Sequence, residues 1–415
     1  MFNKKITPFA LVVAMLICCV VTAVCVGSYS SVKYKAELDS YRNATSPYFE
    51  YSPLIGLVGA EKAKYEKLAQ LISMVDTTYV RDYDKDELWD NVYRSLIVSI
   101  GDTYGDYLTA DAYNAMIDSG SGNFVGIGIH AQRDPDTYGV YVFGVMPNSP
   151  AEQAGMKKGD IIIASEGVIA TENNYYDLLD TIRGESGTEV KLTVRRDGEE
   201  LDLVLVRAAV ASENVIYEKL DNIAYIKILS FSNETVSEEF KTKIELAQNE
   251  GCESFVFDVR NNTGGYLDEI CDVLDLLLPE GPIINIVEAN GNTKTENSDE
   301  HHTEGKMVVL CNGVTASAAE LFTAALRDYE LAKIVGMTTF GKGTMQTTRL
   351  LSDGSAFKLS TAYYNPPSNV SYDGVGIIPD YEINLDEKWN DKFYQMPNEE
   401  DAQLQKAIEI LLSTD

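Results

Sequence analysis

Beyond Ala209, short apolar segments typical of strands alternate along the chain with longer amphipathic segments typical of helices. The strand-like segments are "NIAYIKILSF", "SFVFDV", "KMVVLCN" and "AKIVG", and the helix-like ones are "SEEFKTKIELAQNEG", "YLDEICDVLDLLL" and "SAAELFTAALRD". This alternation predicts an α/β core over residues 209–385, with a mostly parallel sheet and helices packed on it. Ligands of such sheets bind at the carboxyl ends of the strands. Three turns of glycines or small residues follow strands there: "RNNTGG", "NGVTAS" and "TTFGKG".

Residues 113–208 combine short strands, two helical segments and a hairpin that turns at Asp197-Gly198. With the segment "SPAEQAGMKKGDII", this order resembles a PDZ domain. A PDZ loop holds the terminal carboxylate of a peptide with its N–H groups, while the peptide adds a strand to the sheet. We expect Arg183 to add a charged contact; the alternative is a glycine-rich strand start without a ligand. The resemblance places the carboxylate-binding loop on Phe124, Val125, Gly126, Ile127, Gly128 and Ile129.

The first 112 residues contain a candidate membrane segment and candidate helices. Residues 8–27 carry no charge, and this length is sufficient for a helix that spans a bilayer. Because Lys4 and Lys5 precede them, residues 1–7 are expected in the cytoplasm and the rest of the body outside it. A cleaved signal peptide is the alternative. Residues 28–112 are expected to form a stalk and a small helical subdomain, whose apolar stripes predict core packing: Leu68, Leu71, Ile72 and Val75, then Leu88, Val92, Leu96 and Ile100.

Residues 386–415 end the chain with a helical segment, "DAQLQKAIEILLS". Its apolar face can pack on the body or on a second subunit, so a homodimer is one alternative.

Charge and motif spacing exclude several classes of function. The net charge of −30 argues against nucleic acid as a partner, because phosphate binding needs a basic surface. The spacings of Cys252, Cys271 and Cys311 match no metal site, and we expect no metal and no cofactor. "GMTTFGKG" nearly matches a nucleotide-binding P-loop, but Gly343 replaces the hydroxyl that binds Mg²⁺. A hairpin pattern around Asp353-Gly354, rather than a helix, follows it.

Ser317 lies between a strand and a helix, in "CNGVTASAAELF". The positive end of the helix dipole favours a nucleophile there, and the N–H of Ala318 can point at a developing oxyanion. The alternative is that Thr315 or Ser317 only caps the helix, with Glu320 completing a capping box.

The few histidines favour lysine as the base for such a serine. A Ser-His-Asp triad needs a nearby histidine, but the chain has only His130 in the PDZ-like region and His301 and His302 in an acidic stretch. Lys342, in contrast, lies on a glycine-bounded turn at a strand end.

A lysine base must be neutral when it acts. Its pKa, ordinarily about 10.4, must therefore fall by about three units, and burial lowers it. We expect Phe340 and Met345 to bury the amine of Lys342. Gln346 can orient this amine without restoring its charge.

These motifs resemble the carboxyl-terminal processing proteases, which are serine peptidases with a Ser-Lys dyad. "NGVTASAAELFTAALRD" and "GMTTFGKGTMQ" are similar to the family patterns S-A-S-A-S-E and T-F-G-K-G, and "FDVRNNTGG" is similar to D-L-R-N-N-x-G-G. "GDTYGDYLTADAY" and "DGVGIIPDYEI" match two further family segments, and the resemblance covers about residues 64–385. It implies that Ser317 is the nucleophile, Lys342 the general base and Gln346 a supporting residue.

The resemblance also implies an oxyanion hole formed by the N–H of Ala318 and that of Gly264 or Gly265. The implied function is that of a membrane-anchored serine endopeptidase, with its catalytic body on the extracytoplasmic side. It would cleave exported polypeptides near their carboxyl termini, with the PDZ domain reading the free terminus. The alternative is a catalytically silent PDZ binding module or scaffold at the cell surface, which the intact serine, lysine and glutamine disfavour.

Overall fold

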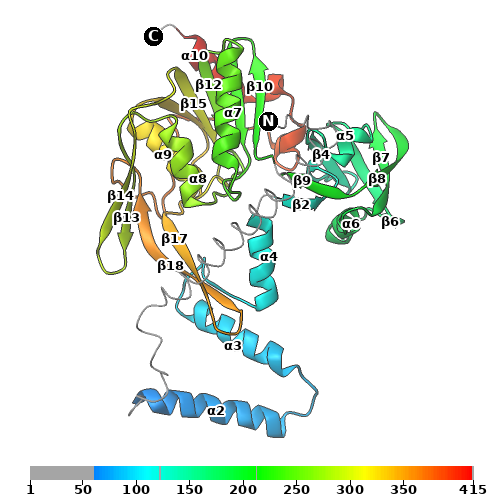
Figure 1. Ribbon diagram of the computed structural model, residues 1–415, viewed down its shortest axis with the longest axis vertical. Coiled ribbons are helices and arrows are strands. Elements are labelled where there is room, and N and C mark those ends of the chain that lie inside the picture. The colour runs from blue at the N-terminus through cyan, green and yellow to red at the C-terminus, as the bar shows by residue number, and fades with distance from the viewer. Residues whose placement is uncertain (1–59, 121–122, 212, 414–415) are drawn as a thin grey trace, which may run out of the picture. The chain divides into compact units, whose positions relative to one another are not determined.

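The computed structural model describes residues 60–120, 123–211 and 213–413. The chain divides into two compact units, residues 1–84 and 85–415. The predicted membrane segment, residues 8–27, lies outside the described residues. Within the described ranges, no helix combines the length and the apolar character needed to cross a bilayer. Figure 1 shows the helices and strands and labels many of them with the names used here.

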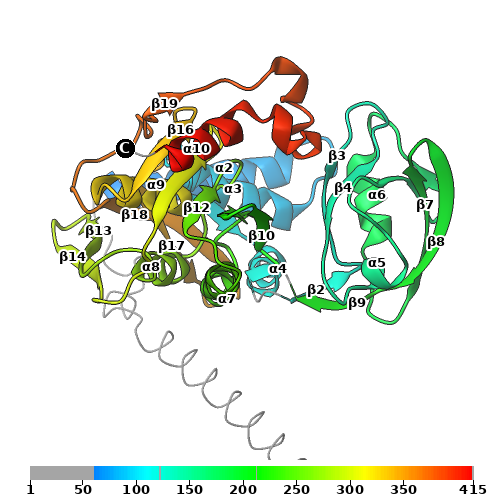
Figure 2. The ribbon, with the colours of Figure 1, turned by 90° about the horizontal axis from the view of Figure 1, so that it is seen from above.

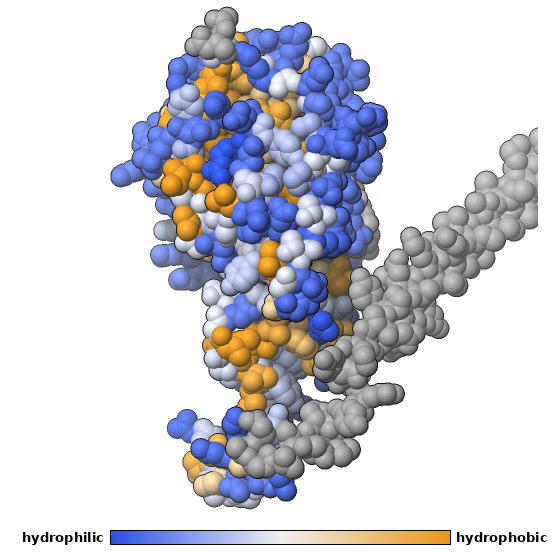
Figure 3. Space-filling model, turned by 90° about the vertical axis from the view of Figure 1, so that its left-hand side faces the viewer, coloured by the Kyte–Doolittle hydropathy of each residue, from blue (hydrophilic) through white to orange (hydrophobic). Residues whose placement is uncertain are grey.

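Two predicted N-terminal helices form, but their apolar stripes are not buried as we expected. α2 (Ala60–Thr78) belongs to the first unit, and Leu71 on it is 51% exposed. α3 (Lys85–Ser99) belongs to the second unit, and Leu96 on it is 65% exposed. The residue that α3 buries is Ile97, so a neighbouring face of this helix packs on the chain. Apolar side chains, in orange, reach the surface on the face drawn in Figure 3.

The core is built on a six-stranded sheet that is mostly parallel, as the alternation predicted. Its strand order is β10-β11-β12-β15-β16-β19, and every neighbouring pair except β10 and β11 is parallel. Along β12, Phe255 and Phe257 face one hydrophobic core and Val256 faces another, so the strand is apolar on both faces. The strands are β10 (Val215–Leu220), β11 (Ile223–Ile228), β12 (Ser254–Asp258), β15 (Lys306–Cys311), β16 (Ala332–Gly336) and β19 (Tyr381–Glu382).

Helices cover both faces of this sheet. α7, α8 and α9 pack on the face of Phe255 and Phe257. α10 packs on the other face through Leu404, Ala407 and Leu411, so the C-terminal helix packs on the body. Figure 2 shows α7 and α10 on opposite sides of the sheet. The helices are α7 (Val236–Asn249), α8 (Leu267–Asp275), α9 (Ala318–Asp328) and α10 (Ala402–Leu412).

A second sheet is antiparallel, and its strand β17 (Thr344–Leu350) directly follows the turn that carries Lys342, called the lysine turn below. β17 and β18 form the hairpin predicted around Asp353-Gly354. β1, from ahead of the PDZ-like region, pairs with β18, so this early segment reaches the surroundings of the lysine turn. The strands are β1 (Asp106–Leu108), β13 (Gly281–Glu288), β14 (Thr293–Ser298), β17 (Thr344–Leu350) and β18 (Ala356–Asn365).

The PDZ-like region has its own sheet and core. The strand order is β3-β4-β5-β7-β8, with β6 paired to β5 and with β3 at one edge. β2 pairs instead with β9 in a separate two-stranded sheet. The elements are α4 (Ala110–Gly120), β2 (Asn123–Gly126), β3 (Ile129–Arg133), β4 (Val140–Val145), α5 (Pro150–Gln153), β5 (Ile161–Ser165), β6 (Val168–Ile169), α6 (Tyr175–Ile182), β7 (Glu189–Arg196), β8 (Glu199–Val206) and β9 (Ala208–Ala211).

Three short 3-10 helices precede α10, and the second of them, η3 (Phe393–Gln395), contacts the PDZ-like region. Tyr394 stacks on Phe143 of β4, with ring centroids 4.0 Å apart. Gln395 donates a hydrogen bond to Asp134 at 2.9 Å. The helices are η2 (Glu387–Trp389), η3 (Phe393–Gln395) and η4 (Asn398–Glu400).

Arg260 begins the turn "RNNTGG" and is fully buried. Its guanidinium donates to both carboxylate oxygens of Asp258 and of Asp401 and to the side chain of Gln403, at 2.7–3.0 Å. All five N–H donors are therefore used. Burial disfavours a charged carboxylate, but the charges of Arg260 and Lys227 hold the pKa of Asp258 below its usual range. These hydrogen bonds therefore hold the first residue of the turn in place.

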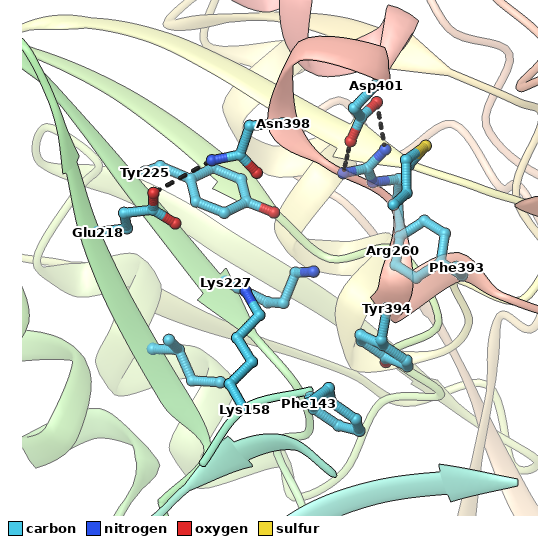
Figure 4. Close-up of a pocket in the computed structure, with 12 residues that line it drawn as sticks. Phe143, Lys158, Glu218, Tyr225, Lys227, Arg260, Phe393, Tyr394, Asn398 and Asp401 are labelled. Atoms are coloured by element: carbon cyan, nitrogen blue, oxygen red, sulfur yellow. Dashed lines mark hydrogen bonds and ion pairs between the residues drawn. The ribbon is translucent and has the colours of Figure 1, made fainter. Parts of the chain in front are cut away.

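The pocket drawn in Figure 4 lies beside this network. Phe143 and Lys158 from the PDZ-like region line it together with Lys227 and Tyr394, whereas neither Ser317 nor Lys342 does. The pocket is therefore distinct from the predicted dyad.

Candidate active site

Ser317 lies at the sharp turn between β15 and α9, in a strained backbone conformation. Its φ is 57° and its ψ is −121°, which is costly for a residue with a side chain. The turn is anchored below it, because the buried Thr315 donates its hydroxyl to the carbonyl of Val259 at 2.9 Å. A strained strand-to-helix turn is also where hydrolases with a nucleophile elbow expose their serine.

Helix capping accounts for only part of the contacts of Ser317. Its N–H donates to the Glu320 carboxylate at 2.9 Å, and the Glu320 N–H donates to the Ser317 carbonyl at 2.8 Å. The serine hydroxyl contacts the Tyr364 hydroxyl at 3.1 Å. Glu320 thus holds the backbone at Ser317, while the serine side chain has a separate partner.

The same buried carboxylate holds the lysine turn. Glu320 also accepts hydrogen bonds from the N–H groups of Gly341 and Lys342 at 2.6 and 2.8 Å and from the Thr339 hydroxyl at 2.6 Å. Gly341 has a φ of 90°, and a Cβ there would lie 2.8 Å from the Gly376 nitrogen. One carboxylate therefore ties the serine turn to the lysine turn. β17 rather than a helix follows Lys342, so the nucleotide-loop alternative has no support.

We predict that Glu320→Gln destabilises the fold and slows catalysis. Its amide nitrogen would face two of the four donors, and each buried group left unpaired costs about 1–3 kcal/mol, so about 2–6 kcal/mol in all. Denaturant unfolding measures this loss, with Glu245→Gln on the exposed side of α7 as the control. If Glu320→Gln kept the wild-type stability and the wild-type rate of cleavage, Glu320 would not be needed to hold the serine turn and the lysine turn together.

The Lys342 side chain is half-buried, and its amine lies over the ring of Tyr104. Its Nζ lies 4.5 Å from the centroid of the Tyr104 ring. Burial and the charge of Lys358 lower the pKa of Lys342, while Glu320 and Asp102 oppose the shift. Within the described part of the chain, the amine makes no hydrogen bond to Ser317.

Phe340 does not bury the amine as we expected, since it is 55% exposed. Met345 packs at the edge of the main core. The ring beside the amine is instead that of Tyr104, which β1 and its flanking residues bring to this sheet.

Gln346 lies on β17, but the hydrogen bonds of its side chain are not with the lysine amine. Its side-chain nitrogen donates to the Ser360 hydroxyl and the Thr344 carbonyl, both at 3.1 Å. Ser360 in turn donates its hydroxyl to Asp102 at 2.9 Å and its N–H at 2.7 Å. The orienting role of Gln346 remains a prediction, whereas these bonds hold the segment that carries Tyr104.

The turn "RNNTGG" lies directly against the serine. A Cβ on Gly264 would be 2.7 Å from the Cβ of Ser317 and 2.9 Å from the nitrogen of Ala318. The Gly264 N–H already donates to the Asn262 side chain at 2.8 Å. Within the described ranges, the N–H groups of Gly265 and Ala318 have no acceptor. Gly265 is therefore the glycine with a free donor.

The predicted carboxylate-binding loop also carries free donors. The carbonyls of Ile127 and Gly128 accept hydrogen bonds from the N–H groups of Ala151 and Met146. The N–H groups of Ile127 and Gly128 themselves have no acceptor in the part of the chain that the structure describes. Ile129 follows as the first residue of β3, which lies at the edge of its sheet.

The other predicted binding residues lie elsewhere. The backbones of Phe124, Val125 and Gly126 belong to β2 and pair with β9. Arg183 ends α6 with its side chain exposed, and it forms an ion pair with Asp180 at 3.7 Å. Among the described residues, no hydrogen bond or ion pair joins Arg183 to the loop.

Comparisons with known proteins agree with this architecture. The model of peptidase family S41 matches residues 222–383, and the PDZ domain model matches residues 124–205. A CtpA-like serine protease of Staphylococcus aureus (strain N315) is 33% identical over 333 residues, which cover 79% of this chain and 66% of the relative. A second, from Staphylococcus haemolyticus (strain JCSC1435), is 31% identical over the same shares. The chain belongs to peptidase family S41.

The predicted membership of the processing-protease family, a family of serine peptidases, is thereby confirmed. The matched region spans 66% of the length of these curated relatives. The crystal structure of an S41 protease from Bacteroides fragilis NCTC 9343 shares the fold, with a TM-score of 0.56 and 17% identity over 80% of this chain and 92% of that one.

For this S41 chain, sequence reasoning missed Tyr104 and Tyr364 and saw Glu320 only as a cap. Alternation along β18 would have grouped Tyr364 with Ala362 on one face, because side chains two apart in a strand point the same way. Both are buried. No local signal could place Tyr104 beside Lys342, because this contact depends on the pairing of β1 with β18.

Proposed function

We propose that this S41 chain is a membrane-anchored serine endopeptidase that cleaves exported polypeptides near their carboxyl termini, with Ser317 as nucleophile and Lys342 as general base. The observation that carries the proposal is the surroundings of Ser317. The serine occupies a strained turn beside the N–H groups of Gly265 and Ala318, which have no acceptor among the residues that the structure describes. The same carboxylate that holds its backbone also holds the turn of Lys342.

The proposed reaction proceeds through an acyl-enzyme. Neutral Lys342 removes the proton of the Ser317 hydroxyl, and Oγ attacks the carbonyl carbon of the scissile bond. The oxyanion that forms accepts hydrogen bonds from Gly265 and Ala318. Lys342 then gives its proton to the leaving amine. Water, activated by the same lysine, hydrolyses the ester and frees Ser317.

Formation of the dyad requires a movement of Lys342. Its amine lies against Tyr104 and has no hydrogen bond to Ser317. The backbones of both residues are held by Glu320, so the change is confined to the lysine side chain. A rotation about side-chain bonds is a small change, and a bound substrate that excludes water would favour the neutral amine.

Residues 8–27 support the membrane anchor, through their length and lack of charge. The lysines before them favour a cytoplasmic N-terminus and an extracytoplasmic catalytic body.

The PDZ-like region is proposed to bind the free carboxyl terminus of the substrate. The free N–H groups of Ile127 and Gly128 next to the edge strand β3 support this role. A bound terminus would raise the effective concentration of the chain at Ser317.

We predict that a peptide ending in a free acid is cleaved faster than the same peptide ending in an amide. Charge-assisted hydrogen bonds are about twice as strong as neutral ones, and a difference near 1.4 kcal/mol gives about tenfold in rate. An activated ester without a peptide terminus is the control, because its rate reports on Ser317 alone. Equal rates for acid and amide would mean that this region does not read the terminus.

Incubation of the purified protein with an unfolded polypeptide tests the function as a whole. We expect mass spectrometry to find a long N-terminal product and short C-terminal products. Binding without any product, at a pH above neutrality, would favour the alternative of a silent binding module.

A further inference from the structure

Tyr364 touches the nucleophile, although no motif in the sequence points to it. It lies in β18 and is only 5% exposed. Its hydroxyl oxygen is 3.1 Å from Ser317 Oγ and 2.9 Å from the carbonyl oxygen of Lys342. It is thus in direct contact with the reacting atom and with the backbone of the proposed base.

The count of protons decides how these two bonds run. A phenol has one proton to donate, and a carbonyl oxygen can only accept. Tyr364 therefore donates to the Lys342 carbonyl, and its oxygen accepts the proton of the Ser317 hydroxyl. Burial raises the pKa of Tyr364 well above its usual value, so the phenol keeps its proton.

Tyr364 is also held by contacts that do not involve its hydroxyl. The Tyr364 N–H donates to the Gly343 carbonyl at 3.0 Å. The ring meets that of Tyr372 edge-on, with centroids 6.1 Å apart and planes at 77°. We therefore expect the ring to keep its position when the hydroxyl is removed.

We propose that Tyr364 is a catalytic residue that donates a hydrogen bond to Ser317 Oγ whenever that atom carries negative charge. As Lys342 takes the serine proton, the Ser317 O–H bond breaks and an N–H bond forms on the lysine. The phenol O–H then turns from the Lys342 carbonyl to Oγ and keeps its own proton. The same bond forms when Oγ leaves the acyl-enzyme. The inference rests on the proposed function of Ser317 and Lys342.

A donor to a charged oxygen forms a stronger bond than a donor to a carbonyl. The gain therefore appears in the transition states and not in the resting enzyme or in substrate binding, which is the condition for an effect on kcat. We expect Tyr364→Phe to lower kcat about tenfold to a hundredfold and to leave KM within about twofold.

The matched control is Tyr363→Phe. Tyr363 is the neighbour of Tyr364 on the opposite face of β18, is 55% exposed, and loses the same single oxygen. The control should keep the wild-type kcat. Both variants are assayed below their own unfolding midpoints, so that a change in stability is not read as a change in rate.

The dependence of kcat/KM on pH distinguishes a hydrogen bond from Tyr364 to Ser317 Oγ from an effect of Tyr364 on the pKa of Lys342. We expect the rise of kcat/KM with pH to stay at the wild-type position in Tyr364→Phe, because the base is unchanged. An unchanged kcat would overturn the inference. A lower kcat would also overturn the inference if the rise of kcat/KM moved to a different pH, because the phenol would then act on the pKa of Lys342. Failure of the proposed function has a different signature, which is cleavage that persists in Ser317→Ala.

Discussion

Replacing Ser317 by alanine is expected to lower the rate of cleavage by about four orders of magnitude or more, because no acyl-enzyme can form without the nucleophile. The two free N–H groups of Gly265 and Ala318 would remain and would leave only a trace of activity. The fold should be unaffected. The N–H of residue 317 still donates to Glu320, and the helix keeps this contact.

Ser352→Ala provides the control for this variant. Ser352 lies exposed in the turn of the β17–β18 hairpin, and its loss should change neither rate nor stability. Peptide cleavage and thermal unfolding are measured for both. Substantial cleavage by Ser317→Ala would place the nucleophile elsewhere.

Replacing Lys342 is expected to have the next largest effect. Loss of a general base costs about 10²–10⁴-fold, and we expect Lys342→Ala to lie in that range. Lys342→Arg should be nearly as inactive, because a guanidinium does not lose its proton at working pH. Lys333→Arg on the exposed position of β16 is the control. Appreciable turnover by Lys342→Arg would contradict the neutral-base mechanism.

The sign of the pH dependence follows from the same group. Burial lowers the pKa of Lys342 from its ordinary value. Because only the deprotonated amine accepts the serine proton, the rate of acylation should rise with pH through that lowered pKa. A rate that is flat from about pH 6 to pH 9, under conditions where chemistry limits, would count against a lysine base.

The sequence predicted the framework of the site well, because the framework follows from patterning. Alternating strands and helices predicted a mostly parallel sheet, and the sheet is parallel except at β10 and β11. The turns that carry Ser317 and Gly265 follow neighbouring strands, so the sheet brings them together. The lysine turn follows the next strand along, β16.

What the sequence could not predict depends on single side-chain contacts. The choice between Gly264 and Gly265 rests on one bond, from the Gly264 N–H to Asn262. The expectation that Phe340 buries the amine of Lys342 was wrong, because a turn can point an aromatic side chain outward as easily as inward. Tyr104 reaches Lys342 only through strand pairing between distant parts of the chain.

The apolar stripes of α2 and α3 show a second limit of prediction from sequence patterns. Periodicity identified α2 and α3 but assigned Leu71 and Leu96 to a core. Periodic spacing reports which residues share a face, and it does not report whether anything covers that face.

In the proposed mechanism, the substrate acylates Ser317 and Lys342 acts as the base. Rapid mixing with excess peptide substrate, acid quenching and peptide mapping by mass spectrometry would test it most directly. We expect an ester-linked acyl group on Ser317 in the wild-type protein within the first turnover, and none in Lys342→Ala over the same time. Cleavage without an adduct on Ser317, or an adduct that forms equally fast without Lys342, would contradict it.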